Sequence, residues 1–190
     1  MALVVISPND PDAMARYADE CRREGLRFLY DPSQQVARLS GEDLREGLSG
    51  ASILIVNDYE FGILTQKTEL SREELEAQVP VLVVTHGAEG STVAVRDGVG
   101  RVTRHEIPAA KLESEAIDPT GVGDAYRAGL IRGMHLGAPW PVAARLGSVT
   151  AVFGLETLGP QPPRYAAAAL RARYERSFGP EPILEKLRME

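Results

Sequence analysis

Three short and almost entirely apolar runs constrain the fold of this chain more than any other feature of its sequence. They cover residues 3–6, 26–30 and 52–56. Continuously apolar runs of this length are typical of parallel strands that are buried on both faces, whereas half-exposed strands alternate apolar with polar residues. The segments between the runs carry apolar residues at helical spacing. This alternation predicts strand–helix–strand units and therefore a parallel sheet.

The rest of the chain extends the same pattern. Residues 80–84 predict a fourth buried strand, and residues 92–95 and 99–105 predict a hairpin with its turn at Arg96-Asp97-Gly98. Such an antiparallel edge is common in α/β sheets. The predicted helices cover residues 11–24, 42–48, 66–77, 121–136, 139–153 and 164–174. We expect an α/β fold with a mostly parallel sheet, formed as a single domain by residues 1–190.

Composition excludes several classes of protein. A chain with 44% hydrophobic and 25% charged residues resembles soluble globular proteins. The formal net charge of −6 gives no general attraction to nucleic acid or to an anionic membrane. The single cysteine, Cys21, excludes an internal disulfide. We therefore expect a cytoplasmic protein with small-molecule ligands and no nucleic-acid or membrane partner.

The motif with the most chemical content is Asp-Pro-Thr-Gly-Val-Gly-Asp at residues 118–124, directly before a predicted helix. Gly121 and Gly123 let the backbone turn tightly and let a ligand approach closely. The unpaired N–H groups and the positive end of the helix dipole together favour an anion such as phosphate. Asp124 beside that anion suits a proton-accepting role. The alternative is an ordinary loop in which the aspartate caps the helix.

Residues 118–124 resemble the D-[ST]-T-G-A-G-D signature of the ribokinase-like (PfkB) carbohydrate and nucleoside kinases. The resemblance implies a three-layer α/β/α fold and assigns Asp124 as the catalytic base. It places the anion hole at the backbone of Gly121, Val122 and Gly123. ATP would be the phosphoryl donor.

Asn57 and Glu60, after the third apolar run, resemble the N-x-x-E motif of the same family. Their spacing places both side chains on the first turn of a helix. Glu60 can hold a hydrated Mg²⁺ through water, in line with the magnesium and phosphate handling that the resemblance implies. The alternative is a plain capping box, in which the two residues satisfy the first N–H groups of the helix.

Thr85, Gly87 and Gly90 follow the fourth strand and resemble the T-x-G-x-x-G segment that lines the nucleotide site of the family. The glycines would allow close approach of the triphosphate or ribose, and Thr85 would donate to a phosphate oxygen. As an alternative, both glycines are turn residues. His86 departs from the usual apolar residue at its position, and we interpret it as a neutral loop histidine.

The resemblance also implies weaker assignments. Asp118 and Thr120 would contribute to a site for a monovalent cation such as K⁺, and Ser148 would lie near the base of the nucleotide. Residues 156–161 resemble the E-x-x-G-x-Q ending of adenosine-kinase-like members, which favours adenosine as acceptor over a simple sugar.

The sequence matches only the C-terminal, nucleotide-binding portion of the family pattern. The N-terminal part of that pattern supplies further strands, a lid, and a Gly-Gly motif that binds the acceptor, and no Gly-Gly pair occurs here. We therefore expect a fragment with an exposed sheet edge that favours self-association or a homodimer.

The predicted function is ATP-dependent phosphoryl transfer to a primary hydroxyl of a sugar or nucleoside. The alternative is a non-catalytic α/β fragment that binds nucleotide or a partner and lacks the acceptor site.

Overall fold

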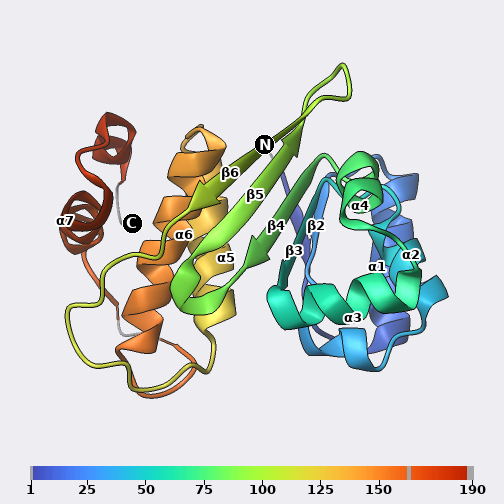
Figure 1. The fold of residues 1–190 in the computed structure, drawn as a ribbon, viewed down its shortest axis with the longest axis horizontal. Coiled ribbons are helices and arrows are strands. Elements are labelled where there is room, and N and C mark those ends of the chain that lie inside the picture. Colours follow the sequence, from blue (N-terminus) through green and yellow to red (C-terminus); the bar gives the residue numbers. More distant parts are fainter. Residues whose placement is uncertain (1, 162–163, 188–190) are drawn as a thin grey trace. The chain divides into compact units, whose positions relative to one another are not determined.

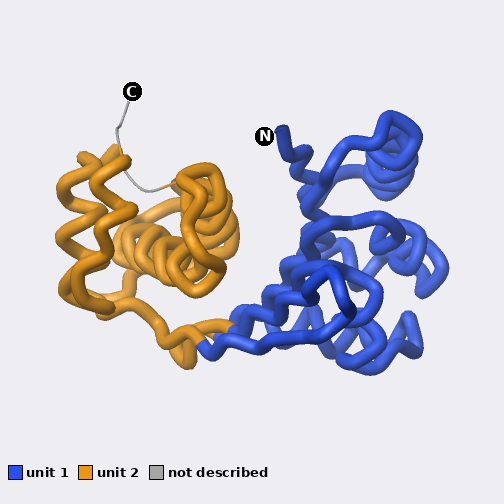
Figure 2. The backbone as a smooth tube through the Cα atoms, turned by 90° about the horizontal axis from the view of Figure 1, so that it is seen from above, with its two compact units in different colours: residues 1–86, 92–106 blue, residues 87–91, 107–190 orange. Residues whose placement is uncertain are grey.

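The computed structural model describes residues 2–161 and 164–187. These residues form two compact units, coloured separately in Figure 2. Unit 1 contains residues 1–86 and 92–106, and unit 2 contains residues 87–91 and 107–190. Each unit is described by itself below.

Unit 1 contains most of a six-stranded sheet whose strands lie in chain order. The strands are β1 (Val4–Ile6), β2 (Phe28–Tyr30), β3 (Ile53–Asn57), β4 (Val81–Thr85), β5 (Ser91–Arg96) and β6 (Val102–Ile107). The first four strands pair in parallel, and β5 and β6 run in opposite directions as a hairpin (Figure 1). The α/β class and the mostly parallel sheet predicted from the apolar runs are therefore confirmed.

Four helices of unit 1 connect the parallel strands. They are α1 (Pro11–Arg23), α2 (Gly41–Leu48), α3 (Asp58–Thr68) and α4 (Arg72–Gln78). The chain also forms two short 3₁₀ segments, η1 (Ser33–Ala37) in unit 1 and η2 (Gly87–Glu89) in unit 2. Right-handed crossovers between strands in chain order all return on the same face of a sheet. The main core cluster of unit 1 agrees with this, because alternate side chains of β2, β3 and β4 pack with residues of these helices, including Met14, Leu48, Leu64 and Leu75.

Unit 2 is built on three helices, α5 (Val122–His135), α6 (Trp140–Leu155) and α7 (Ala167–Phe178), followed by the 3₁₀ segment η3 (Pro182–Lys186). Small residues allow α5 and α6 to approach closely. A Cβ added to Gly129 would lie 2.2 Å from Thr150 Oγ1, and one added to Gly133 would lie 2.6 Å from the Cα of Ala143. Larger side chains at these glycines would separate the two helices.

The main departure from the predicted elements lies between β3 and β4. The single helix expected over residues 66–77 is two helices, and the first of them starts at Asp58. Glu69 ends α3 in the left-handed conformation, with φ of 56°. Ser71 then caps α4 by accepting a hydrogen bond from the N–H of Glu74. This stretch is strongly charged, and neither the end of α3 at Glu69 nor the cap of α4 at Ser71 was predicted from it.

Smaller departures concern element ends. The second strand begins at Phe28 and the last helix at Ala167, each two or three residues later than predicted. The segment between the last two predicted helices lies partly outside the described residues, because the description stops at residue 161 and resumes at residue 164. The single α/β domain expected for residues 1–190 stays a prediction.

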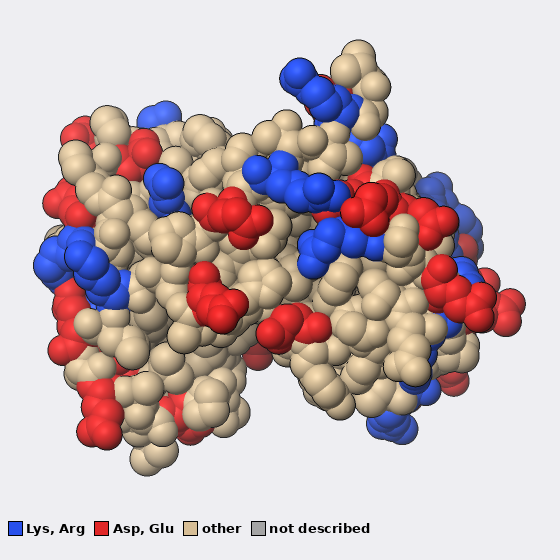
Figure 3. Space-filling model, viewed as in Figure 1, with Lys and Arg blue, Asp and Glu red and all other residues tan. Residues whose placement is uncertain are grey.

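Acidic and basic side chains are interspersed over the face of the molecule shown in Figure 3. Among the helices formed by residues 2–161 and 164–187, none combines the length and apolar character needed to cross a membrane.

Candidate functional site

Three of the predicted site residues meet at the carboxyl ends of β3 and β4 in unit 1. Asn57 is the last residue of β3, Thr85 is the last residue of β4, and the two are paired in the strand register. Glu60 lies on the first turn of α3, which starts directly after β3. Ligands of open α/β sheets bind beyond the carboxyl ends of the strands, so these residues lie at the edge where a ligand is expected.

Asn57 and Glu60 form a complete capping box. Asn57 Oδ1 accepts a hydrogen bond of 2.8 Å from the N–H of Glu60, and Glu60 Oε2 accepts one of 2.9 Å from the N–H of Asn57. The capping alternative is thus realised in the structure. One carboxylate oxygen of Glu60 is used in this way, which leaves the other as the candidate ligand of a hydrated cation.

A magnesium ion at this edge would depend on few protein ligands. The described residues contain no group of three or more His, Cys, Asp or Glu side chains arranged to hold a metal. Mg²⁺ fits such a place when it keeps several waters and is otherwise held by one carboxylate and by substrate phosphates. The Glu60 carboxylate is therefore compatible with magnesium that arrives with a nucleotide.

His86 lies in the loop after β4, as predicted, and its ring is hydrogen-bonded. Its Nε2 lies 3.0 Å from Thr92 Oγ1, and the Thr92 hydroxyl donates to Glu106 Oε2 at 3.0 Å. Because Thr92 has a single hydroxyl proton, the Nε2 atom must be the donor to Thr92. The ring is therefore oriented by its neighbours in unit 1.

Within unit 2, the glycine segment 87–90 has one end fixed by packing and one end open. Gly90 has φ of +101°, and a Cβ there would lie 2.0 Å from the carbonyl oxygen of Ile107. Gly87 also has positive φ, at +57°, but a Cβ there would meet nothing within 4 Å. Gly90 is therefore required by the protein itself, while Gly87 faces space that a ligand can enter.

The start of α5 repeats this division between two glycines. Gly121 is the N-cap residue with φ of +77°, and a Cβ there would lie 2.2 Å from the carbonyl oxygen of Pro160. Gly123 is exposed, and a Cβ there would meet nothing within 4 Å. Gly121 offers no side-chain acceptor to the first turn, so no capping side chain competes with an anion for the N–H groups there. The N–H of Val122 makes a long 3.3 Å contact with Pro119.

Asp124, the predicted base, is exposed on the first turn of α5. Its side chain is 68% exposed, and its Oδ1 lies 2.5 Å from Nη2 of Arg127, whose side chain is only 14% exposed. The pairing of Asp124 with Arg127 was not predicted from the sequence. The spacing of three residues along a helix was the signal that could have indicated it.

Asp118 holds the loop before α5 by accepting hydrogen bonds at both carboxylate oxygens. Oδ1 accepts from the N–H of Thr120 at 2.8 Å, and Oδ2 accepts from the N–H of Gly159 at 2.9 Å. The hydrogen bonds from Thr120, followed by the one from Gly159, lower the pKa of Asp118 below its usual value. The residue therefore connects the loop to the segment that follows α6.

Ser148 has a role inside unit 2. Its side chain is buried, and its Oγ accepts a hydrogen bond of 2.7 Å from the N–H of Ala110. The hydroxyl thus fastens the connector after β6 to the middle of α6.

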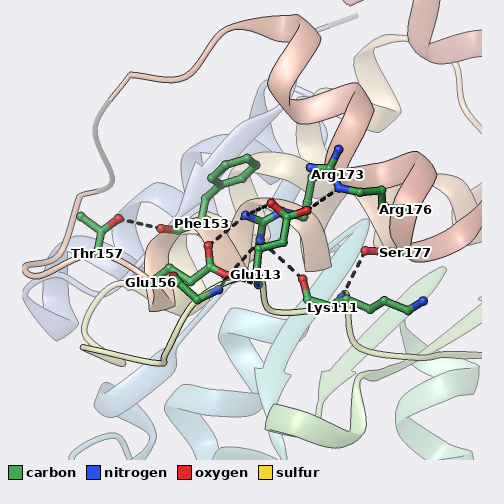
Figure 4. A network of polar contacts seen from close by, with 9 residues as sticks. Lys111, Glu113, Phe153, Glu156, Thr157, Arg173, Arg176 and Ser177 are labelled. Carbon is green, nitrogen blue, oxygen red and sulfur yellow. Dashed lines mark hydrogen bonds and ion pairs between the residues drawn. The ribbon is translucent and has the colours of Figure 1, made fainter.

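A buried ion pair near the end of α6 was also missed from the sequence (Figure 4). Arg173 of α7 makes two hydrogen bonds of 3.0 Å to the carboxylate of Glu156, and their side chains are 5% and 9% exposed. Burial alone raises the pKa of Glu156, but the hydrogen bonds from Arg173 and from the N–H groups of Glu113 and Ser114 outweigh it and lower that pKa. Seventeen residues separate Glu156 from Arg173, so no local pattern indicated the pair.

The same end of α6 positions the connector that leads into the glycine motif. Glu156 Oε1 accepts hydrogen bonds from the N–H groups of Glu113 and Ser114, at 2.6 and 3.2 Å. The carbonyl oxygen of Leu155 accepts from the N–H groups of Ile117 and Asp118, at 2.8 and 3.2 Å. The geometry of the loop before α5 is therefore set by the last turn of α6.

Comparisons with known proteins identify a family to which this chain is similar. The family model described as pfkB family carbohydrate kinase matches residues 2–166. A nucleoside kinase of Methanocaldococcus jannaschii is 30% identical over 84% of this chain and 50% of its own length. A nucleoside kinase of Methanothermobacter thermautotrophicus is 30% identical over 94% of this chain and 56% of its own length.

A solved structure is similar over nearly the whole chain. The Burkholderia thailandensis nucleoside kinase in complex with ADP-inosine has a TM-score of 0.89 and 35% identity, covering 98% of this chain and 57% of that one. The ribokinase-like α/β fold predicted from the resemblance is thereby confirmed. The chain spans about half the length of the curated relatives it matches.

Proposed function

Because the chain belongs to the pfkB family of carbohydrate kinases, we propose that it carries the nucleotide-binding and catalytic part of an ATP-dependent kinase that phosphorylates a primary hydroxyl of a nucleoside. The observation that supports this most is the start of α5. There, backbone N–H groups without a side-chain cap and an exposed carboxylate lie within one helical turn. Phosphoryl transfer needs that combination of an anion-binding backbone and a proton acceptor.

In the proposed reaction, Asp124 accepts the proton of the acceptor hydroxyl as its oxygen attacks the γ-phosphorus of ATP. The bond from that phosphorus to the bridging oxygen of ADP breaks. The N–H groups of Gly121, Val122 and Gly123 stabilise the charge on the transferred group. In acyl transfer one such donor contributes ~3–4 kcal/mol. The N–H of Val122 would have to give up its long contact with the carbonyl of Pro119 before it could act in this way. Arg127 must release Asp124 Oδ1 or share it when the hydroxyl binds.

The remaining assignments follow the same reasoning. Thr85 donates to a phosphate, and the open glycine of segment 87–90 gives the nucleotide room to approach. Mg²⁺ neutralises phosphate charge when bound, and Glu60, oriented by Asn57, would hold it through water. Asp118 and Thr120 remain the proposed contributors to a monovalent-cation site. The hydroxyl of Ser148 holds the connector after β6, and its place near the base of the nucleotide stays a prediction.

A nucleoside is the proposed acceptor because similar proteins are named nucleoside kinases, and one was solved in complex with inosine. The resemblance of residues 156–161 to adenosine-kinase-like endings supports a purine nucleoside over a simple sugar.

The test is calorimetry of MgATP with this chain, combined with turnover assays on adenosine, inosine and ribose. We expect MgATP binding, and ADP release that is larger with a nucleoside than with ribose. Asp124→Asn should abolish turnover and leave the MgATP dissociation constant nearly unchanged. A variant that keeps normal turnover would contradict the role of Asp124 as base.

The second candidate is nucleotide binding without turnover, which is favoured by the chain spanning about half the length of its relatives. Binding of MgATP with no release of ADP in the presence of any acceptor would support it. Self-association is a separate proposal, supported by the edge position of β1 in the sheet. Light scattering of the purified chain would decide between a monomer and a dimer.

A further inference from the structure

Two buried hydroxyl groups in unit 2 have each other as hydrogen-bond partners. Ser91 Oγ and Tyr126 OH lie 2.8 Å apart, and the two residues are 2% and 5% exposed. Burial raises the pKa of Tyr126 to about 12, so its hydroxyl keeps its proton across the physiological range. Buried hydroxyls are costly without partners, so each residue depends on the other.

The bond joins the two glycine segments of the candidate site. Ser91 directly follows Gly90, the last residue of segment 87–90. Tyr126 lies on α5 two residues after Asp124 and five after Gly121. A single hydrogen bond therefore connects the segment proposed to line the nucleotide to the helix whose N-terminus is proposed to bind the phosphate.

Both ends of this bond are held by packing. The ring of Tyr126 lies against α6, where a Cβ added to Gly147 would be 3.3 Å from its Cε1 atom. On the other side, Gly90 is packed against the carbonyl of Ile107 so closely that no Cβ fits. Packing thus restrains both sides of the hydrogen bond. Gly87 and Gly123, on the same two segments, face open space.

We propose that the Ser91–Tyr126 hydrogen bond is a positioning contact, which sets the spacing between segment 87–90 and the N-terminus of α5 so that one nucleotide can contact both. This inference rests on the proposed function. A phenylalanine would fill the space of the Tyr126 ring equally well, so Tyr126→Phe removes only the hydroxyl that makes the contact.

The test uses Tyr126→Phe, Ser91→Ala and the double variant, with melting temperature and the MgATP dissociation constant measured for each. Ser91→Ala leaves the tyrosine hydroxyl buried and unpaired, so it should melt lowest, and the double variant should recover part of that loss. Affinity should behave differently, because all three variants lack the contact. We expect each to bind MgATP roughly two- to tenfold more weakly than the parent chain.

Tyr174→Phe is the matched control, since Tyr174 is another buried tyrosine of unit 2 and lies on α7. It should leave the MgATP affinity unchanged. If the double variant regains the parent affinity along with its melting temperature, the contact is only structural and the inference fails.

A second measurement does not depend on ATP. Hydrogen exchange of the ligand-free chain should be faster at residues 87–90 in Tyr126→Phe than in the parent or in Tyr174→Phe. A parent chain that binds no MgATP would refute the proposed function, and the exchange result would still decide the coupling. Unchanged exchange at residues 87–90 would overturn the inference.

Discussion

The starts of α3 and α5 follow the two motifs with the most chemical content, and they are held in opposite ways. The start of α3 is capped within four residues, by the reciprocal hydrogen bonds of Asn57 and Glu60. The start of α5 has a glycine as its cap and is held from far along the chain, by Pro160 against Gly121 and by Gly159 bonded to Asp118.

This difference shows how a helix terminus is kept open for a ligand. A side-chain cap satisfies the first N–H groups and so competes with any anion. At α5 the loop is stabilised without a side-chain cap, and the N–H of Val122 makes only a long 3.3 Å contact with the carbonyl of Pro119. The consequence is that α5 depends on distant segments for its geometry, whereas α3 depends on itself.

Among substitutions at the two helix starts, Gly121→Ala should have the largest effect. The new Cβ would overlap the carbonyl of Pro160 and would sit at φ of +77°. We expect a loss of unfolding free energy of more than about 4 kcal/mol, together with loss of MgATP binding. Urea denaturation and calorimetry measure the two effects.

Gly123→Ala is the matched control for that substitution, because a Cβ there meets no protein atom within 4 Å. Its stability should stay within about 0.5 kcal/mol of the parent, while its MgATP affinity falls because the Cβ enters the space proposed for phosphate. Equal stability of the two alanine variants would refute the claim that Pro160 holds the α5 start.

The next effect in size concerns the buried ion pair behind the loop. Glu156→Gln removes the charge that pairs with Arg173 and weakens the acceptor of the Glu113 and Ser114 N–H groups. Arg173 keeps a second partner in Glu113, whose carboxylate lies 2.9 Å away. We therefore expect a loss of roughly 2 kcal/mol, below the range for leaving a buried charge unpaired. Thermal denaturation of this variant beside Glu113→Gln, a more exposed member of the same network, tests it. A larger loss of stability for Glu113→Gln than for Glu156→Gln would contradict the prediction that Glu156 is the more important carboxylate of this network.

At α3 the corresponding effect should be smaller. Asn57→Ala removes a single local cap and should cost about 1 kcal/mol. Asn57→Asp keeps an oxygen that can accept the Glu60 N–H, so it should cost less. Denaturant titration of both variants checks the order. A loss for Asn57→Ala that matches the loss for Gly121→Ala would show that α3 is not held locally.

The smallest expected effect is a pH dependence of the α5 loop. The Thr120 side chain, followed by the N–H groups of Thr120 and Gly159, lowers the folded-state pKa of Asp118 below its unfolded value. The stabilisation is therefore fully present well above the unfolded value of about 3.9, and is lost as the pH falls through the folded-state pKa. The stability difference between the parent and Asp118→Asn should be constant near neutral pH and shrink below about pH 4. A difference that grows in acid would have the wrong sign.

Short-range patterns in the sequence determined much of this protein. Continuous apolar runs predicted the four parallel strands, and an Arg-Asp-Gly turn predicted the hairpin. The Asn57–Glu60 spacing contained the capping box as one of its two interpretations. Each of these depends on periodicity or on hydrogen bonds within a few residues, which a single sequence displays directly.

Only the tertiary structure decided which glycine of each motif is packed and which faces open space. It also decided that Asp118 bonds to Gly159, that Glu156 pairs with Arg173, and that Ser91 pairs with Tyr126. These partners lie 17 to 41 residues apart along the chain. Their choice depends on how helices and connectors pack in three dimensions, because contacts between distant segments leave no periodic trace in the sequence.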